Sequence, residues 1–191
     1  MAIAMVSWLG NIDQALGAAR SDQKLALVEF SQAPRCAGCV RLEAEVYPDV
    51  RVAMFLAEHF VPARLVRSEH PQEERRFNIM WTPTLLILEP DATERHRVVG
   101  FLPVEDFIPQ LELGLAKAAF GRSDFGGAQR AFQAICDRYP SADAAPEAVY
   151  WTGVSEYKPN RDRQALKRAA ERLLEQYPRS EWTKKGSVWL S

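Results

Sequence analysis

The hydrophobic and polar positions in the first half of the chain predict short buried strands set between amphipathic helices. Apolar runs rich in branched residues, as in buried strands, occupy residues 25–30, 60–66 and 85–88. A fourth strand is expected at residues 95–101, after the turn signal at residues 89–91. Apolar residues three or four apart predict helices that begin near Asn11, Cys36, Asp49, Gln72 and Pro103. The first half is therefore expected to be an α/β domain.

From Leu113 onward the pattern predicts helices alone. Leu115, Ala128, Phe132 and Pro140 lie at the spacing of a tetratricopeptide unit, in which two helices cross and pack. A second unit is expected over residues 146–177, with a turn at residues 158–160, followed by a capping helix over residues 180–190. The predicted organisation is an α/β domain at residues 1–112 and an all-helical, tetratricopeptide-like domain at residues 113–191. Pro109 is expected to kink its helix or to shift the start.

The strongest chemical signal is the segment Cys36-Ala37-Gly38-Cys39, which lies where a predicted strand gives way to a helix. This spacing in this context indicates a redox-active dithiol. The helix start carries a partial positive charge that stabilises a thiolate, and Arg35 adds a full charge beside it. We therefore expect Cys36 to be the nucleophile and Cys39 the thiol that resolves a mixed disulfide.

Two other interpretations of the cysteine pair are ordinary core cysteines and half of a zinc site. Zinc would need two further ligands. The chain has no second cysteine pair, and His59, His70 and His96 do not have the spacing of a zinc motif. Redox chemistry is the preferred interpretation, with no metal and no cofactor.

A second motif carries a family resemblance. Trp81-Thr82-Pro83-Thr84 leads into the strand at residues 85–88, and together with the strand, cysteine pair and helix upstream it resembles the thioredoxin superfamily. Residues 43–61 are similar to the C-terminal domain of bacterial thiol–disulfide interchange proteins. The resemblance implies an α/β thioredoxin-like fold, with Pro83 in the cis form against the dithiol and Thr82 presenting backbone groups to substrate. Alternatively, Pro83 only begins an edge strand.

The resemblance also implies roles for Glu29 and Arg35. Thioredoxins carry an acidic residue beneath the dithiol, and a buried Glu29 would have a raised pKa and could take the proton of the resolving thiol. The alternative is a half-exposed strand glutamate, because carboxylates are seldom buried. Thioredoxins usually have tryptophan where this chain has Arg35, so a charge replaces a flat apolar platform for substrate.

Composition and charge narrow the choice of binding partners and of cellular compartment. The 191 residues have a formal net charge of -1, which gives no electrostatic case for binding nucleic acid or an anionic membrane. No apolar run approaches the roughly 20 residues that span a bilayer. Residues 1–10 lack the basic start of a secretory signal, and three cysteines do not form a structural disulfide framework. These features favour the cytoplasm.

Two functions follow as hypotheses. The first is a thiol–disulfide oxidoreductase that reduces disulfides in protein substrates, takes electrons from a donor that the sequence does not name, and uses its helical repeats to select a protein partner. The second is a non-catalytic adaptor whose dithiol is vestigial or a redox switch. The motif alone does not fix the direction, because pairs with this spacing have potentials from about −270 to about −120 mV.

Overall fold

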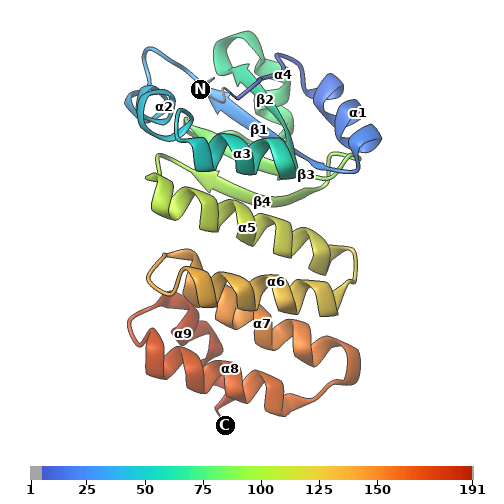
Figure 1. The fold of residues 1–191 in the computed structure, drawn as a ribbon, viewed down its shortest axis with the longest axis vertical. Coiled ribbons are helices and arrows are strands. Elements are labelled where there is room, and N and C mark those ends of the chain that lie inside the picture. Colours follow the sequence, from blue (N-terminus) through green and yellow to red (C-terminus); the bar gives the residue numbers. More distant parts are fainter. Residues whose placement is uncertain (1–5, 191) are drawn as a thin grey trace. The chain divides into compact units, whose positions relative to one another are not determined.

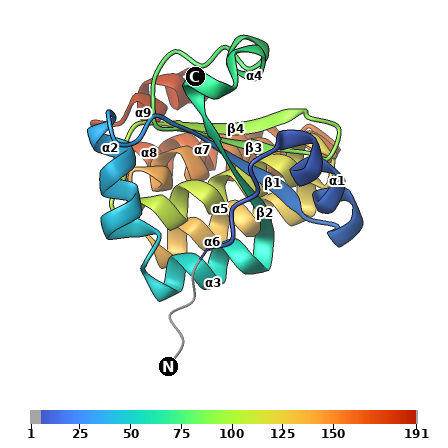
Figure 2. The ribbon, with the colours of Figure 1, turned by 90° about the horizontal axis from the view of Figure 1, so that it is seen from above.

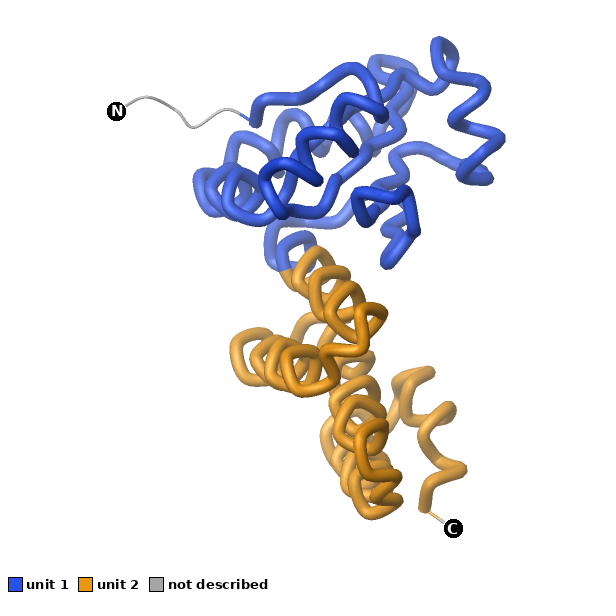
Figure 3. The backbone as a smooth tube through the Cα atoms, turned by 90° about the vertical axis from the view of Figure 1, so that its right-hand side faces the viewer, with its two compact units in different colours: residues 1–108 blue, residues 109–191 orange. Residues whose placement is uncertain are grey.

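The computed structural model describes residues 6–190, so part of the segment on which the secretory-signal prediction rests lies outside the described residues. The chain divides into two compact units, residues 1–108 and residues 109–191 (Figure 3). The boundary falls inside helix α5 (Val104–Gly121). Over residues 6–190, no helix is both long and apolar enough to span a bilayer.

The first unit is built on a four-stranded mixed sheet with helices around it (Figures 1 and 2). The strands are β1 (Leu25–Ser31), β2 (Phe60–Val66), β3 (Thr84–Leu88) and β4 (Glu94–Val99), in the order β2-β1-β3-β4. Strand β1 pairs parallel with β2 and antiparallel with β3, and β3 pairs antiparallel with β4. The helical segments are α1 (Ile12–Asp22), α2 (Ala37–Arg41), the π-helix η1 (Leu42–Val46), α3 (Val50–His59), the 3₁₀ turn η2 (Arg67–Glu69) and α4 (Pro71–Arg76).

Strand β1 is buried along its whole length, and successive side chains point to opposite faces of the sheet. Ala26, Val28 and Phe30 join a hydrophobic core with α1. The residues between them, including Glu29, therefore point to the opposite face. This periodicity places a carboxylate on the face that lies away from the α1 core.

The helix caps follow the sequence closely. The side chains of Asn11 and Asp49 accept hydrogen bonds from backbone N–H groups at the starts of α1 and α3. Such caps satisfy donors that the first turn leaves unpaired. In α2 the same position is held by Cys36, so the helix that follows the first cysteine starts at that residue.

Two boundary predictions are wrong in detail. For Pro109, a kink or a shifted helix start was expected; helix α5 runs continuously from Val104 through Pro109, so the start is not shifted. Strand β4 spans Glu94–Val99 and ends before Gly100, because the φ of 93° at this glycine lies outside the extended range of a strand. The turn expected at residues 158–160 is absent, because the helix at Ala144–Asn160 continues through Pro159.

The second unit is entirely helical over its described residues. Beyond the part of α5 that it contains, it consists of α6 (Phe125–Arg138), α7 (Ala144–Asn160), α8 (Arg163–Gln176), α9 (Glu181–Gly186) and the 3₁₀ turn η3 (Ser187–Trp189). Its core includes Phe132, Ile135 and Leu173. A Cβ atom at Gly153 would collide with the Cβ of Ala169, so this glycine lets α7 and α8 approach closely. The predicted fold class, a mixed sheet with helices followed by a helical region, is confirmed.

Candidate active site

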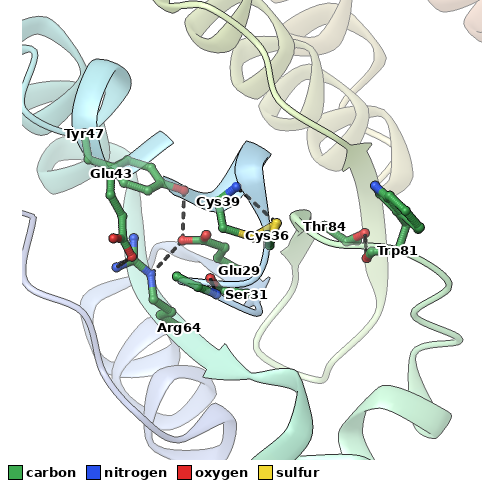
Figure 4. Close-up of a disulfide and its surroundings, with 10 residues drawn as sticks. Glu29, Ser31, Cys36, Cys39, Glu43, Tyr47, Arg64, Trp81 and Thr84 are labelled. Carbon is green, nitrogen blue, oxygen red and sulfur yellow. Dashed lines mark hydrogen bonds and ion pairs between the residues drawn. A yellow bond between two sulfur atoms is a disulfide. The ribbon is translucent and has the colours of Figure 1, made fainter. Parts of the chain in front are cut away.

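The two cysteines of the predicted dithiol lie at the junction of the loop after β1 and the start of α2, and they are joined by a disulfide with a Cα–Cα distance of 5.2 Å (Figure 4). Cys36 Sγ accepts a hydrogen bond from the backbone N–H of Cys39 at 3.1 Å. Cys36 is 8% exposed and Cys39 is fully buried. An incoming sulfur can therefore reach Cys36 more easily than Cys39.

The helix start favours a thiolate at Cys36. The residue occupies the N-cap position, where its sulfur faces unpaired backbone N–H groups and the positive end of the helix. Arg35 precedes it and is exposed. The local structure thus supplies the stabilisation of a negative sulfur that the sequence predicted.

The Pro83 loop lies against the dithiol. The two segments line a pocket of about 280 Å³, whose walls are Gln32, Arg35, Cys36, Ala37, Gly38, Arg67, Trp81, Thr82, Pro83, Gly100 and Phe101. The Thr82–Pro83 peptide bond is cis. A Cβ atom at Gly38 would lie 2.9 Å from Pro83 Cδ, so glycine is needed for this close approach. The structure therefore brings Arg35, Cys36, Thr82 and Pro83 to one site.

Glu29 lies beside this site and is fully buried. Its Oε2 atom accepts hydrogen bonds from Tyr47 Oη at 2.9 Å and from Arg64 Nε at 2.8 Å. Figure 4 shows its carboxyl group between the disulfide and the Arg64 side chain. The alternative of a half-exposed strand glutamate is wrong. Strand β1 is central and both faces of the sheet are covered there, so every one of its residues is buried.

The environment of Glu29 perturbs its protonation. Burial raises the pKa of Glu29, while the charge of Arg64 and the hydrogen bonds from Arg64 and Tyr47 offset part of that rise. Glu29 Oε1 makes no hydrogen bond to any residue in the described range. One carboxylate oxygen is thus held by two donors, and the other remains able to accept a proton.

Arg64 and Tyr47 are functional candidates that the sequence analysis missed. Arg64 lies directly opposite Glu29 in the register of β1 and β2, and its guanidinium also contacts Glu43 at 3.1 Å. It lies over the ring of Trp8, 4.4 Å from the centroid. The available signal was an arginine inside an otherwise apolar strand, because a partly buried arginine in a sheet requires a partner such as a carboxylate on the neighbouring strand.

The third cysteine has a different environment. Cys136 is buried in the core of the helical unit, and burial raises its pKa to about 11. A thiol with so high a pKa is a poor nucleophile at neutral pH. Within residues 6–190, no group of three or more histidine, cysteine, aspartate or glutamate side chains is arranged to hold a metal ion.

Comparisons with known proteins agree with this geometry. A family model described as a thioredoxin-like domain matches residues 12–114, and a tetratricopeptide-repeat model matches residues 147–180. No curated protein matches the chain significantly.

Solved structures share the fold of the α/β domain. A thioredoxin from Thermus thermophilus is 26% identical, with a TM-score of 0.54 over 61% of this chain and 92% of that chain. A putative disulphide-isomerase from Bacteroides thetaiotaomicron is 24% identical, with a TM-score of 0.53 over 58% of this chain and 93% of its own.

The resemblance stated from the sequence is thereby confirmed, for the α/β domain and for the helical repeats. A thioredoxin-like fold that carries a Cys-x-x-Cys pair supports thiol–disulfide oxidoreductase chemistry in general. The repeat match supports a role in protein–protein interaction.

Proposed function

The chain belongs to the thioredoxin-like domain family, and on this premise we propose that it reduces disulfides in other proteins through Cys36 and Cys39. One observation carries the proposal. The more exposed cysteine of the pair caps a helix and opens onto a pocket whose opposite wall is Pro83. An accessible, stabilised thiolate beside a groove for an extended chain is what attack on a protein disulfide requires.

The reaction begins from the reduced dithiol. The Cys36 thiolate attacks one sulfur of the substrate disulfide, so that a Cys36–substrate bond forms and the first substrate sulfur leaves as a thiolate, which takes up a proton. Cys39 then loses its proton and attacks Cys36 Sγ. The Cys36–Cys39 disulfide forms, and the second substrate sulfur leaves as a thiolate, which takes up a proton. Two electrons pass from the protein to the substrate, and a dithiol reductant restores the starting state.

Glu29 is proposed as the acceptor of the Cys39 proton. Its burial favours the protonated carboxyl, so the group can take a proton at a pH where an exposed glutamate would not hold one. Arg64 and Tyr47 act as positioning residues, because they hold one carboxylate oxygen and leave the other free.

Thr82, Pro83 and Arg35 are proposed to contact the substrate. Pro83 closes the pocket opposite Gly38, and Thr82 offers backbone groups to an extended segment. The helical repeats would restrict the choice of protein partner. The cytoplasm is the proposed compartment, in keeping with a reducing activity and few cysteines.

Trapping of the mixed disulfide tests this proposal. The reduced Cys39→Ser protein, mixed with an oxidised protein substrate, is expected to accumulate a covalent complex, because the resolving thiol is gone. The complex is detected as a shifted band without reductant and by mass after thiol alkylation. Cys36→Ser/Cys39→Ser, which retains only Cys136, is the matched control and should form none. A complex that forms equally with both variants, or with neither, would count against the proposal.

A further inference from the structure

An exposed tryptophan stands at the edge of the dithiol pocket. Trp81 is 66% exposed and its neighbour Met80 is 76% exposed, although both are large and apolar. The position of the Trp81 backbone is fixed, since Thr84 Oγ1 donates a hydrogen bond to its carbonyl oxygen at 2.8 Å. Tryptophan and methionine are enriched where proteins contact partners, so this pair is a candidate contact surface beside the reactive sulfur.

The charge around the pocket has one sign. Arginine is the only ionisable residue type on its walls apart from the cysteine, and no acidic side chain lines it. Arg67 is neutralised by an ion pair with Glu74. Arg35 is exposed, and no ion pair joins it to any residue of the described chain. One uncompensated guanidinium therefore lies next to Cys36.

Arg35 and Trp81 come from different segments, yet both line the pocket with Cys36. An extended substrate that passes Cys36 would have residues beside its own cysteine within reach of both side chains. A guanidinium pairs best with a carboxylate, and an indole ring with another ring or a large apolar group. The two contacts together describe a recognisable substrate segment.

We propose that this site selects protein disulfides whose reactive cysteine is flanked by an acidic residue, which pairs with Arg35, and by an aromatic or large apolar residue, which packs on Trp81. The inference rests on the proposed function and adds the class of substrate to it. The electron transfer is unchanged: Cys36 attacks, Cys39 resolves, and the peptide leaves as a thiol.

Matched peptides test the charge preference. Short peptides carry one cysteine in a mixed disulfide with 2-mercaptoethanol and differ only in the neighbouring residue, which is glutamate, glutamine or lysine. Rate constants for reduction by the reduced full-length protein are measured in single turnover. The glutamate peptide is expected to react about fivefold faster than the lysine peptide at low salt, with a smaller ratio at high salt.

Variants identify the residue responsible. In Arg35→Glu the ratio should fall below one, while Arg130→Glu, an equal charge change at an exposed position on α6, should keep the wild-type ratio. Comparison between variants cancels the intrinsic reactivity of each peptide. The same ratio in Arg35→Glu as in the wild type would overturn the charge preference.

A second peptide pair tests Trp81. Peptides with phenylalanine or glycine at the flanking position should differ about fivefold in rate, and Trp81→Ala should reduce that difference. Met54→Ala, which removes another exposed apolar side chain from α3, should keep it. An unchanged difference in Trp81→Ala would exclude the aromatic contact.

The experiments distinguish failure of the substrate preference from failure of the oxidoreductase function. If the protein reduces the uncharged disulfide of 2-mercaptoethanol but treats all peptides alike, the substrate class is wrong and the oxidoreductase stands. If it reduces none of these disulfides, the proposed function fails and the inference falls with it.

Discussion

Replacement of Cys36 by serine is expected to abolish the reduction of protein disulfides, with a loss of at least about 10³-fold in rate. The serine hydroxyl stays protonated at neutral pH and cannot form a disulfide, so neither step of the exchange can begin. The fold should be retained, because the site is a helix cap that serine also fills well. The measurement is the rate of insulin disulfide reduction with dithiothreitol as the electron source.

The matched control is Cys136→Ser, which changes a buried thiol in the helical unit. It should keep the activity, although it is expected to cost some stability. The result also separates the two functional hypotheses. A non-catalytic adaptor predicts that Cys36→Ser binds its protein partner and supports its cellular role as well as the wild type does. Wild-type activity of the purified Cys36→Ser protein would contradict the account outright.

Replacement of Glu29 by glutamine is expected to slow the resolving step about 100-fold, the scale of a general base. Glutamine keeps the size of the side chain and can accept the hydrogen bonds from Tyr47 and Arg64, but it cannot take a proton from Cys39. The step is measured by forming the Cys36 mixed disulfide with a fluorescent thiol and following its release. Glu43→Gln, which also removes a negative charge beside Arg64 but at an exposed position, should change the rate far less.

The pH dependence gives Glu29→Gln a second readout. Burial raises the pKa of Glu29, so the native state binds its proton more tightly than the unfolded state does. The stability gained from this proton is fully present below the unfolded pKa and is lost as the pH rises through the folded pKa. The unfolding free energy of the wild type should therefore fall with pH across this window, and that of Glu29→Gln should fall less. Equal pH profiles for the two proteins would contradict a raised pKa at Glu29.

Most of the chemistry of this site could be predicted from the sequence, because Cys36, Cys39 and Pro83 lie in short recognisable motifs. The spacing of Cys36 and Cys39 at a strand–helix junction already fixes a helix cap and a turn. Pro83 could be identified because it directly precedes a predicted strand that follows the cysteine pair along the chain. Which of two environments Glu29 occupies was not decided locally, since burial depends on what covers the strand on both faces.

The missed residues depend on pairing between distant segments. Arg64 becomes a partner of Glu29 only through the parallel register of β1 and β2, and a one-residue slip would place it on the other face. The exposure of Trp81 could not be predicted from the sequence either, because an apolar residue next to a strand is ordinarily expected in the core. The turn expected at residues 158–160 was wrong because proline was taken to interrupt the helix, whereas α7 continues through Pro159 to Asn160.

The central claim is that Cys36 and Cys39 form a reversible, reducing dithiol. Equilibrium titration of the full-length protein against dithiol buffers at neutral pH tests it most directly, with the redox state read by intrinsic fluorescence and by mass after alkylation. The account predicts a two-electron transition at a potential near −270 mV, confined to this pair. Cys136 should be alkylated only after unfolding. A pair that never closes, or one that closes only near the strongly oxidising value of about −120 mV, would contradict it.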